Sequence, residues 1–226
     1  MGEPCYEMLM SSLPYHGKLF GARQTPLSRF QLNKRLAWLS NDDAEMLVNI
    51  ESVVQWRRQL LDQTDTEFLR QAAEVLASLD NALLEEVVRS RLEIRTLIAA
   101  LRMRMLAQTA PQHGVLFGFG RWVDIIRRHW SEPDFALSRI YPWVVDADRK
   151  LRQRDALGLE KLIMGHLWAE LSRFGFGHYF DFEAVAIYVL RWDLIDRWTH
   201  YNEADATRNI LKLADDGFGE FAGVYH

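Results

Sequence analysis

The sequence predicts an all-α protein built as two unequal bundles of antiparallel helices, with at most a short strand near the N-terminus. After residue 25, apolar residues recur at three- and four-residue spacing through most of the chain, as they do in amphipathic helices. Residue types that cap helices precede several of these stretches. The two-residue alternation that half-buried strands require is almost absent.

Composition indicates a globular protein with a sizeable core and narrows the classes of partner. The chain has 226 residues, of which 49% are hydrophobic and 26% are charged. Its formal net charge of −4 provides no overall attraction to nucleic acid or to anionic lipid. Cys5 is the only cysteine, which excludes an internal disulfide and suits a reducing compartment.

No apolar run reaches the roughly 18 residues that a membrane-spanning helix needs. The first residues also lack the pattern of a signal peptide. We therefore expect a cytoplasmic protein that meets the inner membrane only through partner proteins, without direct insertion. Nucleic acid is not an expected partner, because the three arginines along the long fourth helix are too few to bind it without aromatic stacking positions beside them.

The start of the chain, punctuated by proline and glycine, is expected to be irregular apart from a short strand at residues 5–10. The first helix is expected to open at Thr25, which would act as its cap. Pro26 then occupies the first helical position, where its missing N–H is harmless.

Three further helices are expected before residue 109. Ser40 and the acidic residues after it suit the start of a helix that reaches about residue 61. Capping-box spacing at residues 64–67 begins another helix. A long fourth helix covers about residues 81–108.

Residues 109–120, TAPQHGVLFGFG, give the strongest linker signal inside the chain, because proline and glycine interrupt the helical pattern there. We therefore divide the chain into an N-terminal helical half at 1–108, a linker at 109–120 and a C-terminal helical half at 121–226. The C-terminal half is expected to contain helices at 121–130, 132–140, 143–154, 157–174, 181–201 and 204–214.

Phe-Gly-Phe-Gly occurs at residues 117–120 and 174–177, and Gly-Phe-Gly occurs at 217–219. We interpret Gly175 and Gly217 as helix C-caps, each followed by a phenylalanine that folds back onto the last turn. The copy at 117–120 precedes a helix, whose free N–H groups could attract an anion. It lacks the Lys-Ser/Thr pair of a phosphate-binding loop, so we interpret it as turn chemistry as well.

Residue types that carry catalysis or bind metals form no recognised constellation. The seven histidines are scattered, and no His-Glu-x-x-His or Gly-x-Ser-x-Gly motif occurs. His166 and Glu170 share a helical face, but this spacing alone more often gives a hydrogen bond than a metal site. We predict no catalytic residue, metal, cofactor or small-molecule substrate. A helical-bundle metalloenzyme stays open as the alternative.

Arginines line one flank of the apolar stripe in the long fourth helix. At 100° per residue, Arg91, Arg95 and Arg102 fall on this flank, while Glu86 and Glu93 fall on the other. One interpretation is two solvated flanks beside a buried stripe. The other is a cationic surface that docks an acidic partner helix.

The helix at 181–201 is apolar on two sides, with Trp192 on one and Trp198 on the other. Such a helix is either central in its own fold or has one face against a partner, where tryptophan supplies binding energy. The candidate partner-binding residues of the chain are therefore Arg91, Arg95, Arg102, Trp192 and Trp198.

The stretches YEMLMSSLP (6–14) and TPLSRFQLNKRLAWLSNDDAEML (25–47) resemble a bacterial family of unknown function encoded among V-type ATPase genes. That family also shows an apolar tract ending in Ser-Leu-Pro, then a Pro-opened helix and a Leu-Ser-x-x-Asp helix start. The later stretches FDFEAVAIYVLRWDLIDRW and EADATRNILKLADD are similar to its C-terminal half.

That family is itself similar to the V-type ATPase subunit called C in prokaryotes and d in eukaryotes, an all-helical funnel that seats the rotor shaft on the membrane ring. The resemblance implies a non-catalytic coupling or assembly component, with other V-type ATPase subunits as its partners. The chain is shorter than such a subunit and has room for two helical bundles rather than three. A regulatory interaction module unrelated to ATPases is the second alternative.

Overall fold

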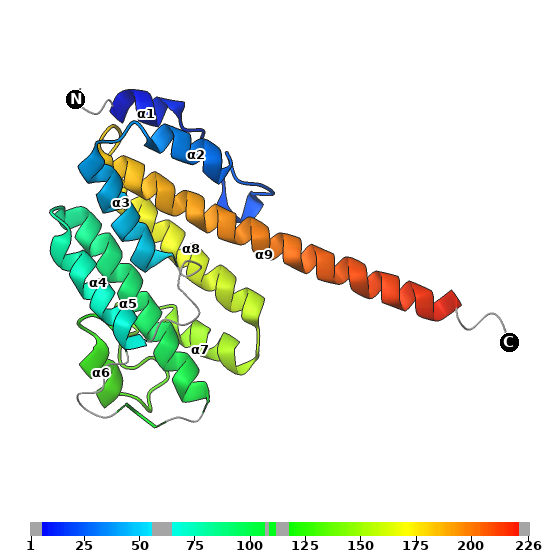
Figure 1. The fold of residues 1–226 in the computed structure, drawn as a ribbon. Helices are drawn as coiled ribbons and strands as arrows, with labels where there is room; N and C mark the ends of the chain where they lie inside the picture. The colour runs from blue at the N-terminus through cyan, green and yellow to red at the C-terminus, as the bar shows by residue number, and fades with distance from the viewer. Residues whose placement is uncertain (1–5, 56–64, 107–108, 112–117, 222–226) are drawn as a thin grey trace.

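The computed structural model describes residues 6–55, 65–106, 109–111 and 118–221, and for residues 65 and 202–221 it describes the backbone alone. Helices are the only regular elements in this part of the chain, which confirms the all-α class. Figure 1 shows their arrangement. They are α1 (Tyr6–Ser12), η1 (Leu19–Gly21), α2 (Arg29–Leu36), α3 (Asn41–Val54), α4 (Asp65–Ser78), α5 (Ala82–Met105), α6 (Val123–Arg128), α7 (Val144–Arg152), α8 (Ala156–Phe174) and α9 (Phe182–Phe221).

The first half of α9 is the central element of the body. It contacts α8, α5 and α3, and it is also covered by α1 and the short η1. Val185, Val189 and Ile195 are fully buried along one side, and Leu190 and Leu194 are nearly so along the other. The second half of α9 continues away from the body as a straight arm (Figure 1).

Both halves of the chain contribute to one hydrophobic core. α5, from the N-terminal half, packs against α7, α8 and α9 from the C-terminal half. The buried side chains of these helices belong to a single cluster. The division of the chain at residues 109–120 stays a prediction, since part of that segment lies outside the described residues.

The predicted start of the first N-terminal helix was three residues too early. α2 begins at Arg29, where Ser28 forms a capping box with Gln31: the Ser28 hydroxyl accepts from the Gln31 N–H, and the Gln31 side chain accepts from the Ser28 N–H. Thr25 and Pro26 therefore precede the helix. This reciprocal cap satisfies two free donors, more than Thr25 with Pro26 could offer.

The next helix starts were predicted correctly. Ser40 caps α3, and Asn81 caps α5 by accepting from the Leu84 N–H at 3.0 Å. α3 ends at Val54, before the predicted end near residue 61, with Gln55 as its C-cap. The rest of that predicted stretch, together with the predicted cap at residue 64, lies outside the described residues.

Two other expectations near the ends of the chain were wrong. The N-terminal strand is the helix α1, which forms because Leu9 can bury against the body while Tyr6 donates a hydrogen bond to Asp43. The predicted helices at 181–201 and 204–214 are one continuous helix, α9. Gly217 lies inside that helix and is not a C-cap.

The predicted helix at 132–140 is a series of turns. The Asp134 carboxylate accepts from the backbone N–H groups of Ala136 and Ser138, so local hydrogen bonds replace helical ones. Phe135 and Ala136 adopt positive φ angles of 51° and 58°. The fully buried ring of Phe135 lies under the Arg104 guanidinium, which supplies the tertiary contact that holds this conformation.

Gly175 is the C-cap of α8, as predicted, but it stays in the right-handed region and Phe176 does not fold back. The left-handed residue of this loop is Gly177, with φ at +91°. Phe176 projects into solvent instead.

The glycines at 118 and 120 allow the chain to pass closely over α5. Phe119 donates its N–H to the Thr96 hydroxyl at 2.7 Å. A Cβ on Gly118 would lie 2.2 Å from Thr96 Cγ2, and one on Gly120 would lie 2.4 Å from Glu93 Cγ. Since the Glu93 carboxylate already occupies this place, an anion would be repelled, and the turn interpretation is supported over the anion-binding one.

Glu93, on α5, holds the segment around Gly120 against this helix. Its side chain is fully buried, although the sequence placed it on a solvated flank. It accepts hydrogen bonds from Trp122 Nε1 and Tyr141 Oη, both at 2.9 Å, and forms an ion pair with Arg121 at 3.2 Å. The polar groups that satisfy it come from segments distant in sequence, so helical periodicity could not reveal its burial.

We expect Gly120→Ala to destabilise the fold by more than Gly177→Ala. Both glycines have positive φ angles, so each alanine carries the left-handed penalty of about 1–2 kcal/mol. Only at Gly120 does the added methyl group also meet Glu93, whereas nothing lies within 4 Å of it at Gly177. Urea unfolding of the two variants measures the difference. Equal losses would show that the close approach to Glu93 contributes nothing.

Candidate interaction surfaces and the buried charge cluster

The predicted cationic flank of α5 does not form a shared exposed surface. Arg91 is only 7% exposed, because α9 packs against this part of α5. Burial lowers the pKa of its guanidinium to about 10, and the nearby carboxylates of Asp193 and Glu170 counteract that shift. Arg91 therefore remains charged at neutral pH, but its charge faces carboxylates inside the fold and not a partner protein.

The other two arginines differ from Arg91 and from each other. The guanidinium of Arg95 stacks over the Phe68 ring of α4, 3.8 Å from its centroid, which is a cation–π contact within the chain. Arg102, near the end of α5, is exposed. Helical spacing placed all three on one flank, but α9 and α4 cover the first two, and only Arg102 is open to a partner.

Both predicted tryptophans are buried within their own fold. Trp192 is 4% exposed and donates its indole N–H to the Leu27 carbonyl at 2.9 Å. Trp198 is 5% exposed, with Phe20 edge-on at 5.2 Å and the Lys161 ammonium 5.4 Å from its ring. This confirms the central-helix interpretation of α9, and neither ring is available to a partner in this structure.

A cluster of charges lies where α9 meets α3, α5 and α8; Glu51 and Arg91 are buried in it, and Glu160, Asp193 and Arg197 are half-buried. Arg197 contacts Glu160 through two nitrogens at 2.5 and 2.8 Å. Burial raises the pKa of Asp193, while Arg91 and Arg197 act to lower it and Glu51 adds to the increase. Buried charges of this kind need partners, and this cluster supplies them from four helices.

A second ion pair extends this cluster toward the surface. The Arg29 guanidinium of α2 binds the Glu51 carboxylate through both of its terminal nitrogens, at 2.5 and 2.7 Å. Glu51 is 1% exposed and also accepts from the Gln55 side chain at 2.7 Å. A bidentate pair fixes orientation as well as distance, so it holds α2 in register with α3.

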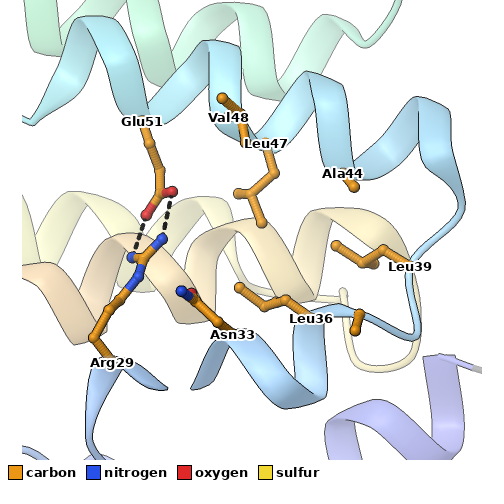
Figure 2. A pocket seen from close by; sticks show the side chains of 9 residues that line it. Arg29, Asn33, Leu36, Leu39, Ala44, Leu47, Val48 and Glu51 are labelled. Carbon is orange, nitrogen blue, oxygen red and sulfur yellow. Dashed lines mark hydrogen bonds and ion pairs between the residues drawn. The ribbon is translucent and has the colours of Figure 1, made fainter. Parts of the chain in front are cut away.

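An apolar groove opens beside this ion pair (Figure 2). It has a volume of about 370 Å³ and lies between α2 and α3. Leu36 and Leu39 line one side, Leu47 and Val48 line the other, and the Arg29–Glu51 pair lies at one end of the labelled set. Val48 is among the exposed large apolar residues. Asn33 lies beside Arg29, so the groove combines apolar walls with an amide and an ion pair at one end.

One group of potential metal ligands occurs among the described residues, at the start of α9. Ligand atoms of His178, Asp181 and Glu183 lie within 4.8 Å of one another. Each already has a partner: Asp181 caps α9 and contacts His178 Nδ1 at 2.7 Å, and Glu183 accepts from Asn81 at 2.8 Å. The positive end of the α9 dipole also disfavours a cation there. The geometry supports a capping role.

Comparison with known proteins adds no relative. No protein-family model, no curated protein and no solved structure matches the chain. Among the described helices, none combines the length and apolar character needed to cross a membrane. The resemblance to proteins encoded with V-type ATPases therefore stays a prediction.

We expect Arg91→Ala to destabilise the fold by about 3 kcal/mol or more, because it leaves buried carboxylates without their compensating charge. Arg102→Ala is the matched control on the same helix, with an expected change within about 0.5 kcal/mol because its side chain is exposed. Urea unfolding of both variants provides the measurement. Similar values for the two would contradict the assignment of Arg91 to the interior.

The raised pKa of Asp193 predicts a specific pH dependence. The folded state binds this proton more tightly than the unfolded state, so the Asp193 contribution to stability decreases as pH rises above the ordinary value of 3.8. The Asp193→Asn variant lacks this pH-dependent contribution to the free energy of unfolding. The unfolding free energy of the variant minus that of the wild type should therefore increase from pH 4 upward and level off above the raised pKa. A gap that is constant or shrinks with pH would contradict the burial of a charged Asp193.

Proposed function

We propose that this chain is a non-catalytic helical coupling or assembly component of a bacterial V-type ATPase, bridging the rotor shaft and the membrane rotor ring on the cytoplasmic side. We choose this assembly because residues 6–14 and 25–47 resemble proteins encoded among V-type ATPase genes. The geometry of α9 supports the bridging role.

The observation that carries the proposal is the arm formed by the second half of α9. The helix has 40 residues, which corresponds to a length of about 60 Å. Its residues 202–221 account for about 30 Å of this length and stand clear of the body (Figure 1). An arm of this kind can reach a partner that the body does not touch.

The sequence of the arm has the pattern of a helix that packs against another helix. Ile210, Ala214, Phe218 and Phe221 recur at four- and three-residue spacing among charged residues. An apolar stripe of this type needs a partner surface to bury it, since a lone amphipathic helix gains little stability in water. We assign that surface to another subunit of the assembly.

The body is suited to hold the arm at a fixed angle. The first half of α9 is buried on both sides, and the charge cluster ties it to α3, α5 and α8. Force applied to the arm therefore acts on the central helix of the core rather than on a surface loop. A coupling component requires such stiff packing and broad contact more than it requires a reactive pocket.

Affinity purification tests the proposal. The full chain, tagged at its N-terminus, is recovered from its native organism at low salt in mild detergent, beside a variant that ends after Tyr201. We expect the full chain to carry V-type ATPase subunits and the shortened variant to lose them, because the arm supplies the contact.

Circular dichroism and a thermal melt of the shortened variant control for folding, since loss of binding has meaning only if the body stays helical. Arg102→Glu in the full chain is a second probe of the one predicted arginine that is exposed. Repeated recovery of a folded, abundant full chain without any ATPase subunit would count against the assembly. Equal recovery by both forms would count against the arm.

A further inference from the structure

Residues 13–22 form the connection that follows α1, and we call them the strap. The strap contains η1, which lies against α9 (Figure 1), and Leu19 within it is buried in the core cluster. The Phe20 ring lies edge-on to Trp198 of α9 at 5.2 Å, and a Cβ on Gly165 of α8 would lie 3.5 Å from the same ring. The strap therefore covers apolar surface on both helices.

His16 of the strap contacts an aromatic side chain of each helix. Its ring stacks on Tyr188 of α9, with the centroids 3.9 Å apart, and stands edge-on to Trp168 of α8 at 6.1 Å. The Tyr188 hydroxyl also donates to the Pro14 carbonyl at 2.8 Å, so this tyrosine holds the strap through its ring and through its hydroxyl. A change in the charge of His16 therefore acts on the contacts that join the strap to both helices.

The surroundings of His16 suit a neutral imidazole. Its Nε2 is buried and has no hydrogen-bond partner among the described residues, so a proton there would find no acceptor. Burial lowers the pKa of the ring to about 4, and the Arg191 guanidinium of α9 acts in the same direction, while a backbone hydrogen bond to Tyr188 opposes the shift. On the strap itself, Tyr15 and Lys18 are exposed.

The titratable and charged groups near His16 come from the helices that pack around it, and they supply no compensating negative charge. α9 contributes Arg191 and the Tyr188 phenol, whose own pKa is raised by burial, so the phenol is neutral at ordinary pH. α2 contributes Arg35, a second cation, which acts on the same phenol. The contact from α8 is Trp168, which does not titrate. Protonation of His16 thus places an uncompensated charge under the strap.

We propose that the strap is an acid-sensitive cover, which leaves α8 and α9 when His16 gains a proton and uncovers the aromatic side chains beneath it. In the open strap, water solvates the imidazolium and separates it from Arg191. Opening also removes Phe20 from Trp198, one of the two tryptophans that the sequence predicted as partner contacts. This inference does not rest on the ATPase assembly proposed above.

Proton linkage gives the direction and size of the effect. The pKa of His16 is its ordinary value of 6.5 in the open strap and about 4 in the closed strap, so the open form binds more protons as pH falls. The closed-to-open ratio is constant well above pH 6.5 and decreases below it until the closed form is also protonated. For one group with these pKa values, the ratio should fall about tenfold from about pH 7.5 to about pH 5.5.

Amide hydrogen exchange of the full chain, followed by NMR at these two pH values, tests the strap. The Gly21 and Ala22 amides donate to the Lys18 and Leu19 carbonyls at 3.1 and 3.3 Å, so their protection measures closure of the strap. After correction for intrinsic exchange rates, we expect the protection factors of both amides to fall about tenfold at the lower pH. They should also stay well below the protection factor of Ile195 in the core, because the strap opens without global unfolding.

His16→Phe keeps an aromatic ring against Tyr188 but cannot take up a proton, so the protection of Gly21 and Ala22 should no longer depend on pH. His166→Gln is the matched control. Burial lowers the pKa of His166 as well, but its ring packs against Trp143 at 5.3 Å, so the tenfold change at the strap should persist in this variant. Loss of the pH dependence in both variants, or in neither, would overturn the assignment to His16.

Titration of the His16 ring by NMR in the unmodified chain needs no variant, and we expect a midpoint below 6.5. A midpoint at or above 6.5 would overturn the proposal, because stacking on Tyr188 would then stabilise the imidazolium. Strap protection that is independent of pH would overturn it too, as would strap amides that exchange only together with Ile195. These readouts need no ATPase subunit, so the strap and the assembly proposal can fail separately.

Discussion

The first half of α9 must be covered on both sides, and the rest of the fold follows from this requirement. A helix with large apolar side chains around most of its circumference is unstable in water unless other helices pack along each face. Here α8, α5 and α3 pack along it, and α1 and η1 add further cover. The buried N–H of Trp192, bonded to the Leu27 carbonyl, extends that cover to the segment before α2.

Charges inside this packing set which arrangement of helices is possible. α9 carries the half-buried Asp193 and Arg197 between the packed helices, where charges of opposite sign on neighbouring helices compensate them. Arg91 on α5 and Glu160 on α8 supply these charges. Apolar contacts tolerate sliding of one helix along another, whereas a paired buried charge does not. The cluster therefore favours a unique register at some expense of stability.

The use of side chains inside the fold also determines which surfaces remain exposed to other proteins. The side chains that first suggested binding, such as Arg91 and Trp192, are used to assemble the core. The surfaces left exposed are different ones, such as the ring of Phe176 between α8 and α9 and the α2–α3 groove beside Val48. The ring of Phe176 lies outside the contacts that stabilise the body, whereas the groove is lined in part by the Arg29–Glu51 pair and by Leu47 of the core.

The sequence by itself determined the all-α class, the starts of α3 and α5, and the two-sided apolar character of α9, because periodicity and capping depend on residues close together in the chain. Only the tertiary structure decided that Glu93 is buried, that residues 132–140 form turns and that one arginine of three is exposed. Those outcomes depend on partners far away in sequence, such as Tyr141 for Glu93 and Arg104 for Phe135. Helical spacing assigns a residue to a flank, but the neighbouring helix decides whether that flank meets water.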